Sequence, residues 1–138
     1  MSQSTTTITA VIGRDRFRTE VNADIHHFIA DEPVSAGGQN LGPEPYQWLL
    51  TALGTCTVMT LRSYADMKQL PVDSIHAVVS LQVEDREGIR HSAIHREITI
   101  EGDIEEELRQ RMIKVADRCP VHRVLTGEIN ISTELKPV

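Results

Sequence analysis

The chain has 138 residues, of which 40% are hydrophobic and 25% charged, a balance typical of one globular domain. Its net charge of −6, without a basic run, argues against binding to nucleic acid phosphates and against docking on anionic membranes. The first residues lack the features of a secretory signal, and the longest apolar stretch, 48–61, is too short to span a bilayer. We therefore expect a cytoplasmic protein with a single domain over residues 1–138. In that compartment paired cysteines tend to be catalytic or redox-sensing.

Three strands are predicted before the first helix. Residues 5–12 are rich in β-branched side chains, and 17–21 and 25–30 follow as the next two strands of a meander. Residues 31–45 contain three prolines and three glycines and predict a loop. The loop ends with Pro45, a residue type favoured at the first position of a helix.

A long helix is predicted over residues 46–69, and its middle is apolar nearly all round. Such a helix is buried on every side rather than laid on a surface. A chain of this size can hardly enclose it alone. We therefore expect a homodimer interface here, or a sheet wrapped around the helix.

The second half of the chain alternates strands and helices. Residues 74–84 and 93–101 have the alternating pattern of an antiparallel hairpin. Asp103 is a candidate N-cap for a helix, a short helix follows over 119–125, and 128–135 is predicted as the last strand. The helix after Asp103 has one apolar face, made of Ile104, Leu108, Met112, Val115 and Ala116. The predicted order is βββ-α-ββ-α-α-β, an α+β fold.

Cys56 and Cys119 are the two cysteines of the chain, and both fall in helical settings. Cys56 lies inside the apolar helix, whereas Cys119 precedes Pro120 and is a candidate N-cap. The free N–H groups and the dipole of a helix N-terminus stabilise a thiolate, and His122 and Arg123 lie within one turn. If the fold brings the cysteines together, they form a thiol redox pair. The alternative is two buried cysteines that act as small hydrophobic side chains.

Other chemistries have weaker signals. Cys119 and His122 have the spacing of one pair of zinc ligands, but no second pair accompanies them. They also fit a Cys–His hydrolase, for which no third orienting group is recognisable. No glycine-rich phosphate loop is present in the sequence. We therefore expect neither a metal nor another cofactor.

Three sequence blocks resemble the osmotically inducible protein C and organic hydroperoxide resistance (OsmC/Ohr) superfamily. They are the loop block 31–46 with its glycines and prolines, the cysteine-bearing block 47–66, and the block 116–123 around Cys119-Pro120. The resemblance covers nearly the whole chain. It implies an intertwined α+β homodimer, in which two cysteine-bearing helices pack centrally and sheets wrap around them.

The resemblance also implies a thiol peroxidase that acts on organic hydroperoxides. In this reading Cys56 is the peroxidatic thiolate and Cys119 the resolving thiol. Oxidation gives a sulfenic acid, then a disulfide, which an external dithiol reduces. The family's peroxidases also use an arginine in the turn after the first strand. Arg14 fits this turn best, and Arg18 is the second choice.

The residues at the start of the long helix are expected to form the substrate pocket, walled by Tyr46, Trp48, Leu49 and Leu53. The best-characterised peroxidases of the family have a glutamate where this chain has Tyr46, and Glu44 lies two residues earlier. His122, Arg123 and Glu44 are expected as outer contacts of the site. The alternative function is a redox sensor, or a binder of a small apolar ligand, on the same scaffold.

Overall fold

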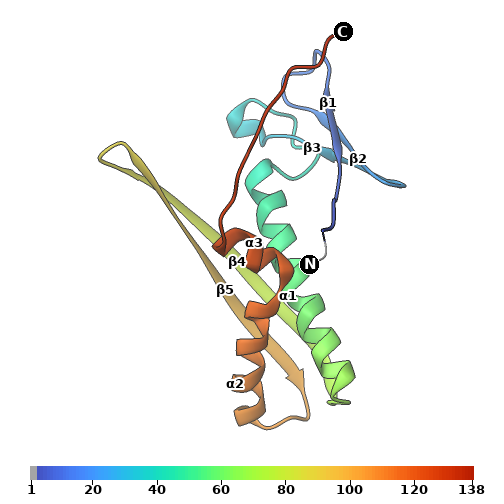
Figure 1. The fold of residues 1–138 in the computed structure, drawn as a ribbon, viewed down its shortest axis with the longest axis vertical. Coiled ribbons are helices and arrows are strands. Elements are labelled where there is room, and N and C mark those ends of the chain that lie inside the picture. The colour runs from blue at the N-terminus through green and yellow to red at the C-terminus, as the bar shows by residue number, and fades with distance from the viewer. Residues whose placement is uncertain (1–2) are drawn as a thin grey trace. The chain divides into compact units, whose positions relative to one another are not determined.

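The computed structural model describes residues 3–138 and has two compact units. The N-terminal unit ends at Leu49 and the C-terminal unit is Leu50–Val138, so the boundary falls inside the long helix (Figure 1). Strands and helices are both present, and the predicted α+β class is confirmed. The single domain over residues 1–138 stays a prediction. Between residues 3 and 138, no helix is both long and apolar enough to cross a membrane.

The N-terminal unit contains the predicted meander. Strands β1 (Thr9–Ile12), β2 (Thr19–Ala23) and β3 (His26–Ala30) pair antiparallel in that order. Asp24 lies between β2 and β3 with a φ of 57°, a left-handed conformation that aspartate tolerates better than most residues. All three strands are therefore close to where the β-branched and alternating segments predicted them.

The loop after β3 is organised around Asp31, whose side chain is only 3% exposed. Its carboxylate accepts the backbone N–H groups of Glu32, Gln39 and Leu41, at 2.7, 3.2 and 3.1 Å. Burial raises the pKa of Asp31, but these three donors and the positive charge of Arg18 outweigh it and lower the pKa. The carboxylate thus takes the place of a strand partner for this loop, which includes the short 3-10 helix η1 (Val34–Ala36).

Two glycines of this loop are required by close packing of the backbone. A Cβ at Gly38 would collide with the carbonyl group of Glu32, and one at Gly42 with that of Ile29. Any other residue would push the loop away from the segment before it. Close approach therefore explains the glycines of the first sequence block at these positions.

Helix α1 (Pro45–Met67) begins with a reciprocal cap. The Glu44 carboxylate accepts the Gln47 N–H, and the Gln47 side chain accepts the Glu44 N–H, both at 3.0 Å. Pro45 occupies the first helical position, as predicted. The helix buries one stripe in the single chain, made of Leu53, Thr57, Leu61 and Ala65.

The opposite side of α1 is exposed in the single chain, so the expected burial on every side is not met within one copy. Met59 is 68% exposed and Met67 is 70% exposed. Large apolar side chains at such exposure on a central helix need a partner surface to leave water. The homodimer that the sequence predicts stays a prediction.

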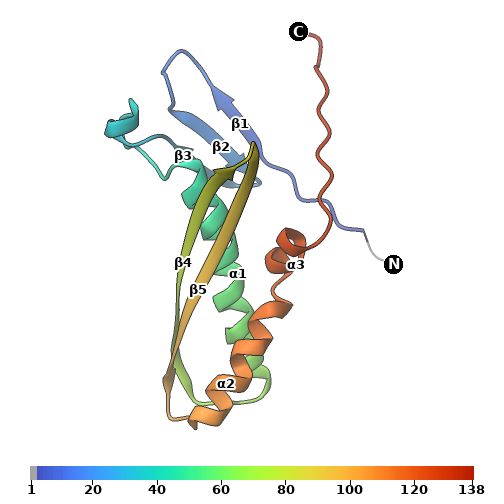
Figure 2. The same cartoon turned by 90° about the vertical axis from the view of Figure 1, so that its left-hand side faces the viewer.

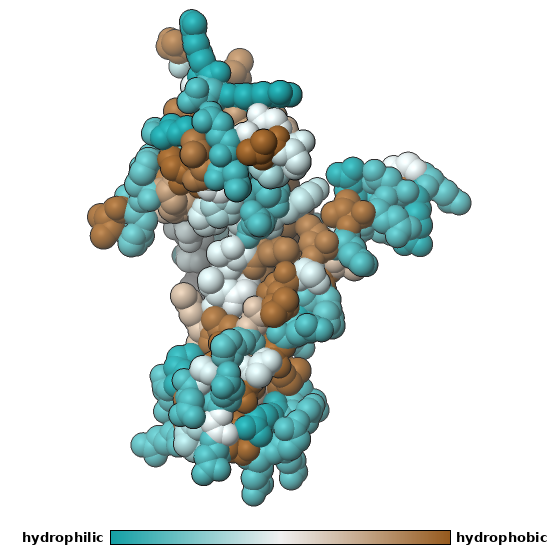
Figure 3. Space-filling model, turned by 180° about the vertical axis from the view of Figure 1, so that it is seen from behind, coloured by the Kyte–Doolittle hydropathy of each residue, from teal (hydrophilic) through white to brown (hydrophobic). Residues whose placement is uncertain are grey.

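Strands β4 (Val72–Arg86) and β5 (Ile89–Gly102) form one antiparallel hairpin that is longer than predicted. Glu87 and Gly88 form its two-residue turn, with φ of 54° and 76°. Turns with two positive φ values match the twist of hairpin strands, which allows the pairing to continue to the turn. Hydrophilic side chains cover the free end of this hairpin, as Figure 3 shows.

The alternating pattern of the hairpin positions its core-facing residues. Ile75 pairs with Ile100 and Ala77 with Ile98, and the isoleucines belong to or pack against the main core cluster. The next pair on this face is Val79 with Arg96. An arginine thus occupies a core-facing position in the hairpin.

Helix α2 (Glu106–Val115), the turn η2 (Ala116–Arg118) and helix α3 (Pro120–Thr126) complete the C-terminal unit. Figure 2 shows α1 and α2 on the same side of the β4–β5 hairpin. The core cluster lies between these elements and contains Leu61, Ala65, Val72, Ile100, Met112, Val115 and Ala116. Every member of the predicted apolar face of α2 belongs to this cluster or packs against it, so that prediction is confirmed.

Two boundary predictions were wrong. Asp103 does not cap α2, because the N-cap is Glu105. Arg109 donates to the carbonyl groups of Ile100, Gly102 and Ile104, which fixes the turn before the helix and delays its start.

The second wrong boundary concerns residues 128–135, which form no strand. In the described chain they pair with no other segment, and a strand needs such a partner for its backbone hydrogen bonds.

Candidate active site

Cys56 and Cys119 lie side by side in the C-terminal unit. Cys56 lies in the middle of α1, and Cys119 is the N-cap of α3. Their thiol side chains are hydrogen-bond partners, and both are free of a disulfide. Cys119 is 0% exposed, whereas Cys56 is partly exposed. The two cysteines are therefore close together but differ in access from solvent.

The environment of Cys119 favours its thiolate. The predicted N-cap position is confirmed, because the Sγ atom of Cys119 accepts the backbone N–H of His122 at 3.5 Å. Burial raises the pKa of Cys119. However, hydrogen bonds from the Cys56 thiol, the N–H groups of His122 and Val121 and the Thr57 hydroxyl outweigh it, so that this pKa is lowered.

The environment of Cys56, in contrast, disfavours its thiolate. Burial raises the pKa of Cys56, and its hydrogen bond and charge interaction with Cys119 raise it further. The N–H of Val121 and the hydroxyl group of Thr60 only partly compensate. When the pair holds one proton, that proton therefore resides on Cys56 and the negative charge on Cys119. The family resemblance, in contrast, implies the thiolate on Cys56.

An apolar groove of about 610 Å³ opens at Cys56. Its walls are small or apolar side chains of α1 together with the start of α3. The lining residues beside Cys56 are Ala52, Thr55, Met59, Thr60, Ser63, Pro120 and Val121. A small apolar molecule in this groove would reach the Cys56 sulfur, whereas Cys119 is covered.

Arg96 is the residue of this site that the sequence analysis missed. Its Nη1 donates to the Thr57 hydroxyl oxygen at 2.9 Å and to the Ala116 carbonyl oxygen at 3.4 Å. Its Nη2 donates to Asp117 Oδ1 at 3.2 Å and to His122 Nδ1 at 2.9 Å. The available signal was a charged residue at a core-facing position of an alternating strand, between Ile94 and Ile98.

His122 and Arg123 lie where the sequence placed them, on α3 next to Cys119. Because a guanidinium group only donates, Nδ1 of His122 accepts from Arg96 and the imidazole proton lies on Nε2. His122 therefore contacts the Cys119 thiol through its backbone N–H and Arg96 through its ring. The backbone N–H of Arg123 donates to the Cys119 carbonyl oxygen at 3.1 Å.

Leu53 lies on the buried stripe of α1, away from the groove at Cys56. It lines a smaller cavity of about 260 Å³ together with Arg96 and His122. The other expected pocket residues, Tyr46, Trp48 and Leu49, belong to the N-terminal unit. Trp48 packs on Phe28 with ring centroids 4.8 Å apart. The assignment of these three residues to the pocket stays a prediction.

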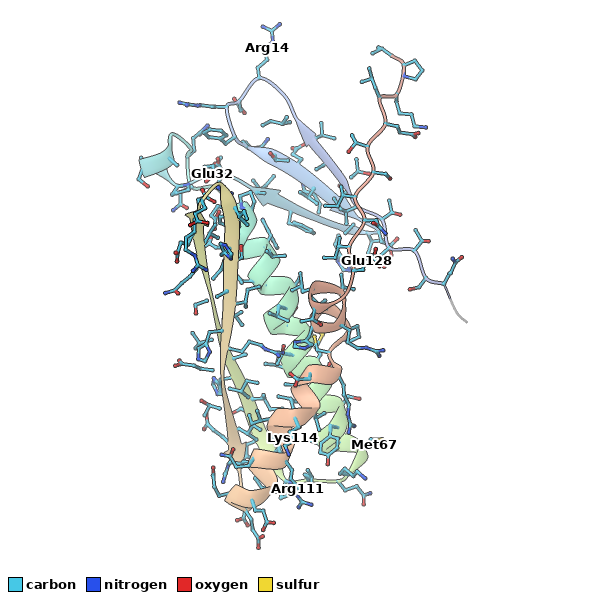
Figure 4. All side chains as sticks on the ribbon, turned by 60° about the vertical axis from the view of Figure 1, so that its left-hand side comes forward. Arg14, Glu32, Met67, Arg111, Lys114 and Glu128 are labelled. Atoms are coloured by element: carbon cyan, nitrogen blue, oxygen red, sulfur yellow. The ribbon has the colours of Figure 1, made fainter. Side chains whose placement is uncertain are left out.

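The predicted arginines also belong to the N-terminal unit. Arg14 lies in the turn after β1, as expected, and Figure 4 shows it pointing away from the sheet. Arg18 forms an ion pair with Glu20 at 3.3 Å. The Glu44 carboxylate is already bound to the backbone at the start of α1. Their contribution to the cysteine site stays a prediction.

Residues 3–138 contain no cluster of three or more histidine, cysteine, aspartate or glutamate side chains that would hold a metal ion. The described part of the site is thus built from a thiol pair, a hydroxyl group, a guanidinium group and backbone N–H groups. This arrangement can lower the pKa of one thiol and bring a second thiol into contact with it. It can therefore support thiol–disulfide chemistry.

Comparison with solved structures shows the same fold in several proteins. An OsmC-like protein from Mycoplasma pneumoniae is 23% identical, with a TM-score of 0.77 over 91% of this chain and 90% of that one. The organic hydroperoxide resistance protein OhrB of Bacillus subtilis is 23% identical, with a TM-score of 0.64 over 96% and 98%. An organic hydroperoxide resistance protein from Elizabethkingia anophelis is 19% identical, with a TM-score of 0.70 over 91% of both chains.

Among curated protein sequences, none matches this chain. A family model described as OsmC-like protein matches residues 37–134, which is most of the chain and includes both cysteines and Arg96. With the shared fold, this match confirms the resemblance seen in the three sequence blocks. The chain belongs to the OsmC-like protein family.

Proposed function

We propose that this protein is a thiol-dependent peroxidase that reduces organic hydroperoxides. The observation that carries the proposal is the contact between a partly exposed thiol in an apolar groove and a buried thiol with a lowered pKa. The names of two proteins of similar fold, both organic hydroperoxide resistance proteins, support the same substrate class. The protein would act in the cytoplasm without a metal or other cofactor.

Cys56 is the thiol that a hydroperoxide can reach. Its proton first passes to the Cys119 thiolate through the hydrogen bond that joins the two sulfur atoms. The Cys56 thiolate then attacks the terminal peroxide oxygen, so that an S–O bond forms and the O–O bond breaks. The alkoxide takes a proton from Cys119 or from water and leaves as an alcohol. Cys56 is left as a sulfenic acid.

Cys119 then resolves the sulfenic acid. Its thiolate attacks the Cys56 sulfur, an S–S bond forms and the S–O bond breaks, and the leaving hydroxide takes a proton from solvent to become water. In sum, two thiols and one hydroperoxide give one disulfide, one alcohol and one water molecule. An external dithiol would reduce the disulfide by exchange and restore both thiols.

The proposed site also includes residues of the N-terminal unit. We propose that Arg14, or else Arg18, supplies positive charge near Cys56, since burial and Cys119 both raise the pKa of Cys56. We also propose that Tyr46, Trp48 and Leu49 extend the apolar wall in a homodimer. A second copy would pack on the exposed side of α1 and form a further wall of the groove at Cys56.

Counting thiols tests the proposal. The reduced protein is mixed with cumene hydroperoxide, and free thiols are measured before and after. We expect wild type to lose both thiols and to react faster with cumene hydroperoxide than with hydrogen peroxide. Cys56→Ser should not react, because a hydroxyl group is not ionised at neutral pH. Cys119→Ser should react once and stop at the sulfenic acid.

The raised pKa of Cys56 favours a second candidate function, a redox sensor or a binder of a small apolar ligand in the groove. A thiol that keeps its proton reacts slowly with peroxides. If wild type retains both thiols under conditions that oxidise a known peroxidase, the enzyme proposal is wrong and this candidate replaces it.

A further inference from the structure

We propose that Arg96 is a positioning residue for Cys119: it holds the turn that carries this cysteine and keeps its sulfur directed at Cys56 for the resolving step. The inference rests on the proposed peroxidase function and assigns to it a residue of β5 that does not touch either sulfur. The guanidinium group of Arg96 binds four acceptors around the turn that carries Cys119.

Arg96 binds the chain on both sides of Cys119. One nitrogen contacts the Ala116 carbonyl oxygen, three residues before the cysteine, and the other contacts His122 Nδ1, three residues after it. The same two residues bond to Cys119 directly. The Cys119 N–H donates to the Ala116 carbonyl oxygen at 3.2 Å, and the His122 N–H donates to the Cys119 Sγ at 3.5 Å. Arg96 therefore fixes the two groups that orient Cys119.

Thr57 provides the third connection, from the side of α1. Its hydroxyl oxygen accepts from Arg96 at 2.9 Å, and its one proton faces two competing acceptors, the Leu53 carbonyl oxygen at 2.7 Å and the Cys119 sulfur. Thr57 is 0% exposed, so water cannot replace these contacts. A positive charge bound to a hydroxyl group strengthens that group as a donor. Arg96 thereby favours negative charge on the Cys119 sulfur without touching it.

The position of Arg96 predicts which step of the reaction it serves. Its side chain is 14% exposed and lines the small cavity that it shares with Leu53 and His122, not the groove at Cys56. It therefore has no direct access to a peroxide in the groove. Attack of Cys119 on the oxidised Cys56 requires both the orientation and the charge that Arg96 maintains. Loss of Arg96 should slow this second step more than the first.

The test uses the full chain and compares five variants with wild type. Arg96→Met removes the charge and keeps the length of the side chain, and Arg96→Lys keeps the charge but cannot bind both sides of the turn. Thr57→Val removes the hydroxyl group at nearly constant shape, and Thr57→Ser restores it. Arg62→Met is the matched control, because Arg62 is a half-exposed arginine of the same unit that binds Asp66 and the Val72 carbonyl oxygen.

Two measurements distinguish a positioning role of Arg96 from a purely structural one. The first is the titration of thiolate absorbance in the reduced proteins, which needs no peroxide. The second is the single-turnover reaction with cumene hydroperoxide, in which dimedone traps sulfenic acid at Cys56. We expect Arg96→Met and Thr57→Val to shift the first thiolate midpoint to higher pH. We expect their disulfide formation to slow about tenfold, the typical effect of losing a hydrogen bond to a charged group.

Sulfenic acid should accumulate in Arg96→Met and Thr57→Val relative to Arg62→Met, because disulfide formation slows more than the loss of the first thiol equivalent. Thr57→Ser should restore both readouts, and Arg96→Lys should restore them only in part. The proposal is overturned if Arg96→Met matches Arg62→Met in thiolate midpoint and in disulfide formation. If Arg96→Met does not fold, Thr57→Val is compared with Thr57→Ser instead. Equal thiolate midpoints and equal rates of disulfide formation in these two variants would then overturn the proposal.

A failure of the proposed function is distinguishable from a failure of this inference. If wild type does not react with the hydroperoxide, disulfide formation is driven with diamide, which oxidises thiol pairs directly. Slower disulfide formation and a higher thiolate midpoint in Arg96→Met would then support Arg96 as a positioning residue in a protein that is not a peroxidase. Equal values in Arg96→Met and Arg62→Met would overturn the inference there as well.

Discussion

At the scale of single residues, one cysteine is accessible from solvent and the other carries the negative charge. Cys56 lines the groove, and Cys119 is buried under α3 with several hydrogen-bond donors around its sulfur. Negative charge on Cys119 opposes ionisation of its neighbour, because two thiolates in contact repel each other. Cys119 thus carries the negative charge in the resting protein, and Cys56 becomes a thiolate only when it attacks the peroxide.

This coupling predicts that Cys119→Ser makes Cys56 more reactive toward an alkylating reagent. Burial is the largest cause of the raised pKa of Cys56 and remains in the variant, but the contribution of Cys119 is removed. The pKa of Cys56 should therefore fall toward the ~8.5 of a free thiol. The measurement is the rate of Cys56 carboxamidomethylation by iodoacetamide as a function of pH. A midpoint equal to or above that of wild type would contradict the predicted direction.

At the scale of elements, the N-terminal loop depends on one carboxylate. Asp31 collects three backbone N–H groups that no strand partner satisfies, and Gly38 and Gly42 allow the backbone segments to approach. The loop leads directly into the cap at Glu44 and the start of α1. The order of the loop therefore extends to the first turn of α1.

The lowered pKa of Asp31 gives a pH prediction for this loop. Because the pKa is lower in the folded than in the unfolded chain, the stabilisation is complete above the ordinary value of 3.8 and is lost as pH falls through the folded value. Asp31→Asn should thus be less stable than wild type at neutral pH, and the difference should shrink in acid. Urea denaturation across this range measures it. Asp24→Asn in the β2–β3 turn is the control, and a difference that does not change with pH would contradict the prediction.

At the scale of the whole molecule, the exposed side of α1 and the C-terminal segment have no partner among residues 3–138 of one chain. The segment after Gly127 carries exposed Ile129, Ile131 and Leu135 in the alternating pattern of a strand. Alternating apolar residues usually cover a core-facing sheet surface. We expect both features to be covered by the second copy in the homodimer.

A single charge should test this assembly. Met59 is 68% exposed in one chain, so Met59→Glu should leave the isolated fold within about 0.5 kcal/mol of wild type. In the homodimer the same charge would be buried without a partner, at a cost of several kcal/mol. Sedimentation should show a dimer for wild type and a monomer for Met59→Glu. Val78→Glu, at 64% exposure on β4, is the control that should remain dimeric. A dimeric Met59→Glu would place the interface elsewhere.

Features that depend on local pattern could be predicted from the order of the amino acids alone. The alternation of Ile75 with polar neighbours predicted the hairpin, the spacing of Met112 and Val115 predicted the core face of α2, and Pro120 predicted Cys119 as an N-cap. These succeed because helix and strand periods, caps and prolines act over a few residues. The family, too, was recognisable from three sequence blocks.

The groups that meet at the cysteine pair could not be predicted in this way, because folding brings them together from distant parts of the chain. Arg96 reaches Thr57 from 39 positions along the chain, because pairing of β5 with β4 and packing of α1 on the hairpin bring them together. The direction of the pKa shifts of Cys56 and Cys119 likewise depends on burial and on donors from separate elements. No local pattern encodes these contacts. They arise from long-range packing, in which the energy of each group is set by neighbours far away in sequence.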